Sequence, residues 1–282
     1  MKKITRRSFM AAAGLTVAAL ALTACGGSSS TASSAAASSV ASSAAASSEA
    51  ASAAATELTT VEAGKLTMAT NAAFPPYEMT TDAGEFEGID IETAQAIADK
   101  LGLELQIDDM DFDAALLSVQ QGKADIVMAG VTVTDERKAV MDFSDSYATG
   151  IQSIIVPEGS DIASPDDLAG KKIGTQRGTT GYIYCSDDFG DETVVAYDDG
   201  LTAVQALNNG QVDAVVIDNA PAQEFIAANP GLKILDTSYA EEDYAIGMAK
   251  GSSLEDAVNA ALKELKADGT LQSIVDKYIT AE

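Results

Sequence analysis

Short apolar runs alternate with amphipathic stretches from about residue 62 onward. A run of Leu, Thr, Met and Ala predicts a strand over 65–70, and apolar residues at helical spacing predict a helix over 90–101 that Gly102 ends. The same pattern continues with an expected strand over 103–107, a helix over 113–121 and a strand over 124–129. This alternation indicates an α/β fold with mostly parallel strands.

A helix-and-strand unit occurs twice, over 116–130 and over 204–218. Each copy has a glycine after the helix and an aspartate before the strand: Gly122 and Asp125 in the first copy, Gly210 and Asp213 in the second. We infer two similar α/β lobes, with chance pairing of a common unit as the alternative.

Two residues directly follow the equivalent strands, Gly130 in the first copy and Asp218 in the second. Ligands of open α/β sheets bind beyond the carboxyl ends of the strands, so both are expected to face one cleft if the lobes face each other. With Pro221 in the next turn, Asp218 can also simply cap a helix. The sequence leaves both roles open.

The segment over 131–138 carries an arginine in an unusual place. Thr134 is expected to cap a helix whose positive end repels Arg137, so this arginine requires an anion nearby. A solvated arginine paired with a surface acid is the alternative. With the Thr132 hydroxyl beside it, the site suits a carboxylate, and Asp218 across a cleft would suit the ammonium group of an amino acid.

Aromatic residues follow the first two expected strands. Phe74 and Tyr77 lie with Asn71 in a proline-containing loop that is expected to be irregular, and Phe112 follows the second strand. Prolines do not continue a central strand, so this loop is expected at a sheet end. These side chains either fill the core or form a wall of the binding cleft.

The chain lacks histidine, and its 43 Asp and Glu against 17 Lys and Arg give a formal charge of -26. The lack of histidine excludes His-dependent triads, His proton shuttles and imidazole metal sites, and neither a metal nor a cofactor is expected. Strong acidity repels phosphate backbones, so no nucleic-acid partner is expected. The hydrophobic fraction of 46% is sufficient for a substantial core.

The first 60 residues are expected to direct export and to tether the protein. Residues 1–24 have a basic start and an apolar stretch too short to span a bilayer, as in a signal peptide. The motif LTAC ending at Cys25 resembles a lipobox, which implies lipidation of Cys25; a stray cysteine is the alternative. Paired arginines leave export by Sec or Tat open. Residues 25–60 form a Ser/Ala-rich spacer, and Cys185 is expected to be an inert core thiol.

Five stretches carry a family resemblance: ATNAAFPPYEM (69–79), FEGIDIETAQAIADKLG (86–102), MAGVTVTDERKAVMDFSDSY (128–147), DLAGKKIGTQRGTTG (167–181) and VDAVVIDNAP (212–221). They resemble the solute-binding proteins of family 3, the polar amino-acid-binding proteins of bacterial ABC importers. The resemblance implies a two-lobed periplasmic-binding-protein fold of type II (Venus flytrap) with two hinge strands. One lobe would comprise 62–150 plus 247–282 and the other 151–246, with hinges near 149–154 and 244–248.

The same resemblance implies ligand-binding roles. The ligand carboxylate would be bound by Arg137, Thr132 and Thr180. The ammonium group would be bound by Asp218 and the Gly130 carbonyl. The ligand side chain would lie between Phe74, Tyr77 and Phe112. Asn71 stands where relatives that bind basic amino acids or glutamine often carry aspartate.

The function implied by the resemblance is extracytoplasmic capture of a polar L-amino acid in the cleft and its delivery to an ABC permease with a cytoplasmic ATPase. The protein would be a monomer held at the membrane only through the lipid on Cys25, and not an enzyme. Two alternatives are a cyclohexadienyl-type dehydratase on the same fold, with Glu78 as candidate acid, and an amino-acid sensor or adhesin lipoprotein. The ligand side chain, whether polar neutral, cationic or cystine, stays open.

Overall fold

The computed structural model describes residues 58–279. The expected signal peptide, the lipidation site at Cys25 and most of the 25–60 spacer lie outside the described residues. Within the described part, no helix is both long enough and apolar enough to cross a membrane.

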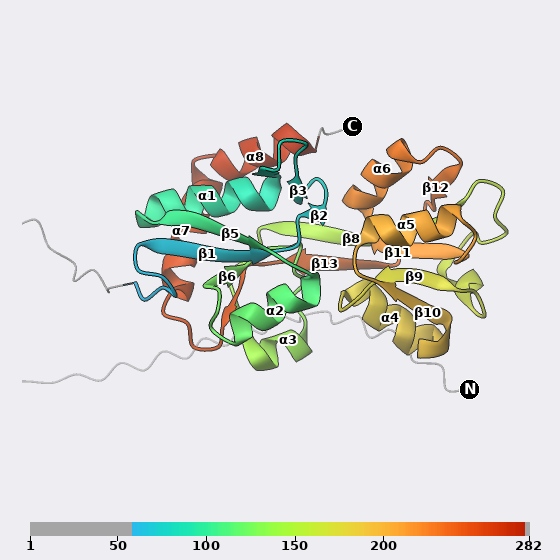
Figure 1. Ribbon diagram of the computed structural model, residues 1–282, viewed down its shortest axis with the longest axis horizontal. Coiled ribbons are helices and arrows are strands. Elements are labelled where there is room, and N and C mark those ends of the chain that lie inside the picture. Colours follow the sequence, from blue (N-terminus) through green and yellow to red (C-terminus); the bar gives the residue numbers. More distant parts are fainter. Residues whose placement is uncertain (1–57, 280–282) are drawn as a thin grey trace, which may run out of the picture. The chain divides into compact units, whose positions relative to one another are not determined.

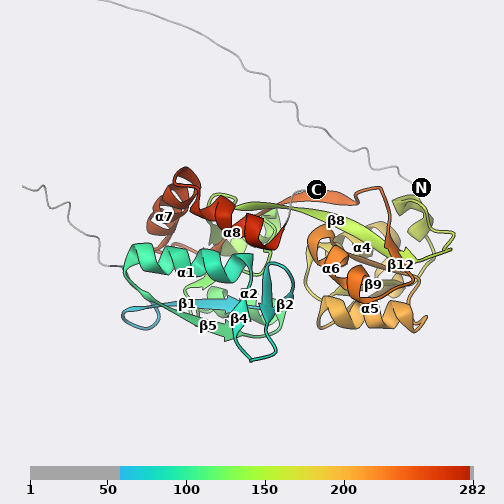
Figure 2. The ribbon, with the colours of Figure 1, turned by 90° about the horizontal axis from the view of Figure 1, so that it is seen from above.

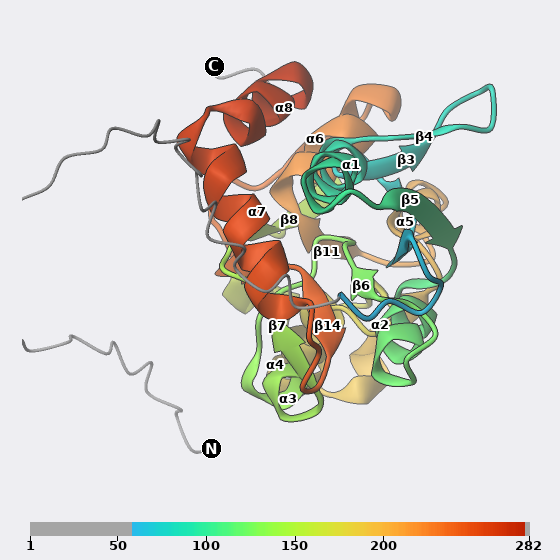
Figure 3. The same cartoon turned by 90° about the vertical axis from the view of Figure 1, so that its left-hand side faces the viewer.

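The first sheet has five strands in the order β5-β1-β6-β14-β7. These strands are β1 (Lys65–Thr70), β5 (Glu104–Asp109), β6 (Ile126–Val127), β7 (Met141–Phe143) and β14 (Gly247–Ala249). Its helices are α1 (Ile89–Leu101), α2 (Phe112–Gln120), α3 (Asp135–Val140), α7 (Glu255–Ala267) and α8 (Thr270–Tyr278). Helix α1 packs with α7 and α8 over one face, as Figures 1 and 3 show, and α2 covers the opposite face.

The second sheet has six strands in the order β10-β9-β11-β8-β12, with β13 also paired to β8. These strands are β8 (Ala148–Pro157), β9 (Ile173–Gln176), β10 (Val194–Tyr197), β11 (Ala214–Asp218), β12 (Leu232–Ile234) and β13 (Ala240–Tyr244). Helices α5 (Gly200–Asn208) and α6 (Asn219–Ala228) lie on one face and α4 (Thr180–Phe189) on the other (Figure 1). Two short 3-10 helices span Pro165–Leu168 and Asp191–Thr193.

The expectation of mostly parallel strands is wrong. In the described part of the chain, parallel pairing joins β5, β1 and β6 in one sheet and β10, β9 and β11 in the other. The remaining strands of both sheets pair antiparallel. The antiparallel partners are distant in the chain, because β8 pairs with β11, β12 and β13, and β14 pairs with β6 and β7. The local pattern of apolar residues does not specify the direction of such distant pairings. The strand expected over 124–129 is also shorter, because only Ile126 and Val127 pair.

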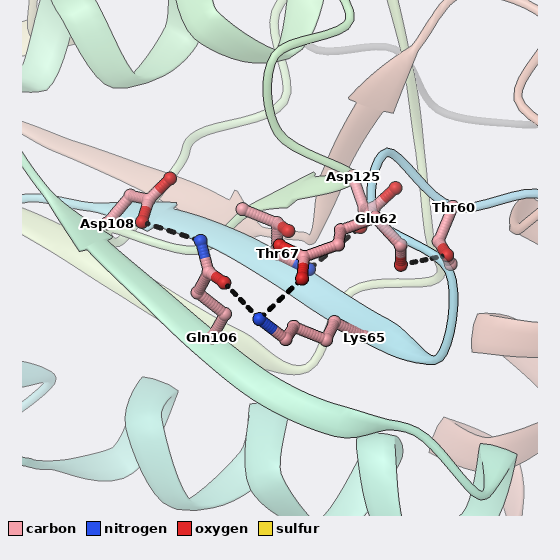
Figure 4. Close-up of polar contacts among 7 residues, drawn as sticks. All are labelled: Thr60, Glu62, Lys65, Thr67, Gln106, Asp108 and Asp125. Carbon is pink, nitrogen blue, oxygen red and sulfur yellow. Dashed lines mark hydrogen bonds and ion pairs between the residues drawn. The ribbon is translucent and has the colours of Figure 1, made fainter.

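The two repeated units are confirmed as structural counterparts, α2–β6 and α5–β11. The Asp125 carboxylate accepts the backbone N–H of Thr67 at 2.7 Å, at the start of the neighbouring strand β1 (Figure 4). The Asp213 carboxylate accepts the N–H of Lys172 at 2.8 Å, directly before β9. Each aspartate therefore satisfies a backbone donor that its parallel neighbour leaves unpaired, which explains why the unit repeats it.

Helix α1 forms as its sequence predicts. Its apolar stripe is fully buried at Ala94, Ile97 and Ala98. Gly102 ends the helix in the left-handed conformation, with φ at 69°, which costs little for a residue without Cβ. Cys185 is buried in α4, where burial raises the pKa of its thiol to about 12, so the thiol stays protonated at neutral pH.

The chain passes twice between the two sheets. It enters the second sheet through β8 and returns from β13 to β14, so β8 and β13 run side by side (Figures 1 and 2). The apolar core is continuous across this connection, because Tyr77 packs against both Phe74 and Tyr244. The residues expected in an irregular loop instead begin a small sheet of β2 (Ala73–Phe74), β3 (Glu78–Thr80) and β4 (Phe86–Glu87).

Candidate functional site

A buried cavity lies where the carboxyl ends of the parallel strands of both sheets meet. Its empty volume is about 440 Å³, which includes space open to solvent. From the first sheet and its loops come Asn71, Phe74, Glu78, Phe112, Ala129, Gly130, Thr132 and Arg137. From the second sheet come Gln152, Gln176, Thr179, Thr180, Val216, Ile217, Asp218 and Tyr244. Every residue predicted to bind ligand, except Tyr77, therefore lines one cavity.

Arg137 is the positive charge of the cavity. Its backbone N–H donates to the Thr134 hydroxyl at 3.2 Å, so Thr134 caps α3 as expected. Its guanidinium is buried and donates to the carbonyl oxygens of Thr132 at 2.8 Å and Gly178 at 3.1 Å, while its centre lies 5.4 Å from the Phe112 ring centroid. No carboxylate within residues 58–279 forms an ion pair with it. The guanidinium has further N–H donors, so an anion entering the cavity would complete its bonding.

Asp218 combines the two roles that the sequence left open. Its carboxylate caps α6 by accepting the N–H of Ala220 at 3.0 Å, and it accepts the N–H of Ile151 at 2.7 Å. The same carboxylate lines the cavity and is only 2% exposed. Burial raises its pKa to about 6, although both backbone hydrogen bonds act to lower it. A cationic ligand group would therefore restore the charged form that burial disfavours.

The raised pKa of Asp218 predicts how the stability of the ligand-free protein depends on pH. A carboxyl that binds its proton more tightly when folded contributes stability below its unfolded pKa, near 4, and loses it as pH rises through about 6. We expect this group to lower the free energy of unfolding by on the order of 2 kcal/mol over that pH range. Between pH 4.5 and 7.5, the melting temperature should fall less with rising pH for Asp218→Asn than for wild type, because an amide does not titrate. Equal slopes would contradict this assignment.

Glu78 is a second acid of the cavity, and it is completely buried. In the described part of the chain, neither of its carboxyl oxygens meets a hydrogen-bond donor. Burial and then the neighbouring Asp90 carboxyl raise its pKa well above the usual value. Asp90 accepts hydrogen bonds from the Gly130 N–H at 3.1 Å and the Tyr147 hydroxyl at 2.8 Å. The raised pKa favours the protonated form of Glu78, which lines the cavity, and a cationic ligand group there would favour the ionised form instead.

The two sides of the cavity touch each other through hydrogen bonds. The Gln176 amide donates to the Asn71 side-chain oxygen at 2.8 Å, and Asn71 in turn donates to the Met110 carbonyl at 3.0 Å. The hydroxyl oxygens of Thr132 and Thr180 lie 3.4 Å apart. The cavity is therefore covered from both sides, so charges inside it are poorly screened by water.

Tyr77 is the one predicted binding residue that does not line the cavity. Its ring lies behind Phe74, 5.9 Å between centroids, and meets Tyr244 edge-on at 5.4 Å. The hydrophobic pattern could not separate this supporting position from a lining one, because Phe74 and Tyr77 are both buried aromatics of one short segment.

Several polar residues of the site were missed in the sequence. They are Gln152, Gln176, Thr179, Glu242 and Tyr244. Glu242 lies beside the cavity and accepts the Thr132 and Thr180 hydroxyls. The available signal was the spacing of two between Glu242 and Tyr244, which places them on the same face of a strand.

Comparison with known proteins gives the class. Residues 66–281 match the family model of bacterial extracellular solute-binding proteins, family 3. The chain is 33% identical over 226 residues to the L-cystine-binding protein TcyJ of Escherichia coli (strain K12), covering 78% of this chain and 85% of that one. It is 33% identical over 230 residues to the arginine-binding extracellular protein ArtP of Bacillus subtilis (strain 168), covering 77% and 87%.

A solved structure agrees with this assignment. The arginine-, lysine-, histidine-binding protein ArtJ of Geobacillus stearothermophilus superposes with a TM-score of 0.74 at 34% identity, covering 77% of this chain and 96% of that one. The fold is thus the two-lobed periplasmic-binding-protein fold that the sequence resemblance implied. The chain belongs to the bacterial extracellular solute-binding proteins, family 3.

Proposed function

We propose that this protein captures an L-amino acid in the cavity between its two sheets and presents it to an ABC permease outside the cytoplasm. The observation that carries the proposal is that Arg137 and Asp218, both buried, line the same cavity. An amino acid is a zwitterion and needs one cationic and one anionic site. Arg137 would bind the carboxylate, with Thr132 and Thr180 beside it, while Asp218 and the Gly130 carbonyl would receive the ammonium group.

The proposed ligand has a cationic side chain. Glu78 lines the same cavity as a completely buried carboxyl, and Phe74 and Phe112 supply aromatic walls. A guanidinium or ammonium group would satisfy Glu78 and stabilise its ionised form. The names of two relatives agree, since ArtP is called arginine-binding and ArtJ arginine-, lysine-, histidine-binding, whereas TcyJ is called cystine-binding. The amide of Asn71 is engaged by Gln176 and Met110, which leaves Glu78 as the main determinant.

Transport follows from the same architecture. One lobe, proposed as 62–150 plus 247–282, would bind the ligand first, and the other, 151–246, would close over it about the strands that connect the sheets. The closed surface would dock on the permease. Residues 1–24 would be removed on export, and a lipid on Cys25 would hold the monomer at the membrane through the 25–60 spacer.

A thermal-shift screen against the twenty amino acids, ornithine, citrulline and cystine tests this proposal. At about 100-fold above its dissociation constant a ligand adds about 2.7 kcal/mol of stability, which raises the melting temperature measurably. We expect arginine, lysine or ornithine to give the largest shift. A screen without any shift would contradict amino-acid binding, and a shift confined to neutral amino acids would contradict the role of Glu78.

One observation favours a catalytic alternative. Glu78 is a buried carboxyl of raised pKa on the cavity, as a general acid would be. A cyclohexadienyl-type dehydratase would use it to protonate a leaving hydroxyl. The relatives reported above are named as binding proteins, which favours binding without chemistry. Incubation with arogenate or prephenate decides the matter, because product formation that Glu78→Gln abolishes would establish the enzyme.

A further inference from the structure

A buried carboxylate that the family resemblance did not assign lies next to the anion-binding end of the cavity. Glu242 projects from β13 and is 6% exposed. Its Oε2 accepts the Thr180 hydroxyl at 2.9 Å, the Thr132 hydroxyl at 3.1 Å and the Gln152 amide at 2.9 Å. Thr132 follows the first sheet, whereas Thr180 begins α4 of the second, so one carboxylate joins residues from both.

These hydrogen bonds occupy the donors that a ligand carboxylate would need. A threonine hydroxyl has a single proton to donate, so a hydroxyl bonded to Glu242 offers only lone pairs to the cavity. The charge of Glu242 also acts on Arg137, where it is the main influence opposing the fall in pKa that burial causes. Its other oxygen, Oε1, is buried without a hydrogen-bond partner among residues 58–279, so the carboxylate is not fully compensated by these surroundings.

We propose that Glu242 is a specificity-determining residue: an internal carboxylate that competes with the ligand carboxylate for Thr132 and Thr180 and disfavours ligands of negative net charge. Two carboxylates that share donors in a covered cavity repel each other strongly. The penalty is greatest for a ligand with a second acid and smallest for one whose side chain is cationic. This inference rests on the proposed function, because it requires a ligand carboxylate at Arg137.

Calorimetric titration of wild type and Glu242→Gln with L-arginine, L-glutamine and L-glutamate tests the proposal. Glutamine has nearly the same size as glutamate but carries no charge. We expect Glu242→Gln to bind L-arginine and L-glutamine on the order of tenfold more tightly than wild type does. The increase in affinity should be largest for L-glutamate. Glu241→Gln is the matched control, because Glu241 is exposed on the opposite face of β13 and its replacement should change nothing.

The outcomes separate the inference from the function on which it rests. If Glu242 served only to hold the structure together, Glu242→Gln would bind all three amino acids equally or more weakly, and the inference would fall. If Arg137→Ala bound them as tightly as wild type does, or if neither wild type nor Glu242→Gln bound any, the proposed function would fall with it. Weaker binding in Arg137→Ala together with no gain in Glu242→Gln would overturn the inference alone.

A second measurement detects the shared hydroxyl itself. Thr180→Val removes the hydroxyl with little change in volume. We expect it to cost more affinity for L-arginine in the Glu242→Gln background than in wild type, because only there is the hydroxyl released to the ligand. Equal costs in the two backgrounds would show that Glu242 does not compete for Thr180. Melting curves of wild type and of every variant show whether each is folded.

Discussion

Replacing Arg137 by alanine is expected to weaken amino-acid binding at least about thirtyfold while the protein stays folded. The guanidinium is the cavity's positive charge, and its carbonyl partners, Thr132 and Gly178, leave further N–H donors for a ligand. Truncating one partner of a buried charge pair costs about 2 to 5 kcal/mol, or at least about thirtyfold in the dissociation constant. For a ligand of about micromolar affinity, that loss moves the dissociation constant to between about 30 μM and about 5 mM.

Arg177→Ala is the matched control for this variant. Arg177 directly follows the cavity residue Gln176 in the sequence, but its side chain is 52% exposed and forms an ion pair with Asp198 at 3.3 Å on the surface. Its replacement removes the same charge without touching the cavity and should leave affinity unchanged. Equal weakening by both variants would mean that overall charge, rather than the bond to the ligand, explains the effect. Unchanged affinity in Arg137→Ala would contradict the proposed site.

Asp218→Asn is expected to have the second largest effect on binding. The variant keeps an oxygen that can cap α6 but loses the negative charge that would receive the ligand ammonium. We expect a loss of about 2 kcal/mol or more in binding free energy, measured by calorimetry. The new amide would also place its NH₂ against the N–H of Ile151, so a stability cost of about 1 to 3 kcal/mol is expected as well.

The helix cap at Asp199 supplies the control for Asp218. Asp199 caps α5 by accepting the N–H of Thr202 at 2.7 Å, and it is not a cavity residue. Asp199→Asn should therefore perturb a helix start without changing affinity. If Asp218→Asn bound the ligand as well as Asp199→Asn did, Asp218 would be a capping residue only.

Local sequence rules predicted the elements that depend on local interactions. Thr134 and Asp218 cap their helices, Gly102 ends α1, and the repeated Asp125 and Asp213 mark equivalent strand starts. Each of these depends on a hydrogen bond or a backbone conformation set within a few residues or by one neighbouring strand. The caps and the helix end are visible in a single chain segment, whereas Asp125 and Asp213 bond to a neighbouring strand and only their repetition is visible in the sequence.

The parts that escaped prediction depend on distant pairing. Strand β13 pairs antiparallel with β8, about ninety residues earlier in the chain, and only that pairing brings Glu242 beside Thr132 and Thr180. In the sequence, Glu242 lies in an acidic stretch that is typical of a solvated surface. Gln152 and Gln176 are equally inconspicuous, because an isolated glutamine in a strand shows neither burial nor partner. The side that Tyr77 faces likewise depends on the packing of Tyr244.

The central claim, recognition of both charged ends of an amino acid in one cavity, is tested most directly by calorimetric titration with L-arginine and with agmatine. Agmatine is arginine without its carboxylate and keeps the guanidinium side chain. The account predicts that L-arginine binds with about micromolar affinity and that agmatine binds at least about thirtyfold more weakly, because Arg137 then has no anion. Equal binding of the two, or no binding of L-arginine, would contradict it.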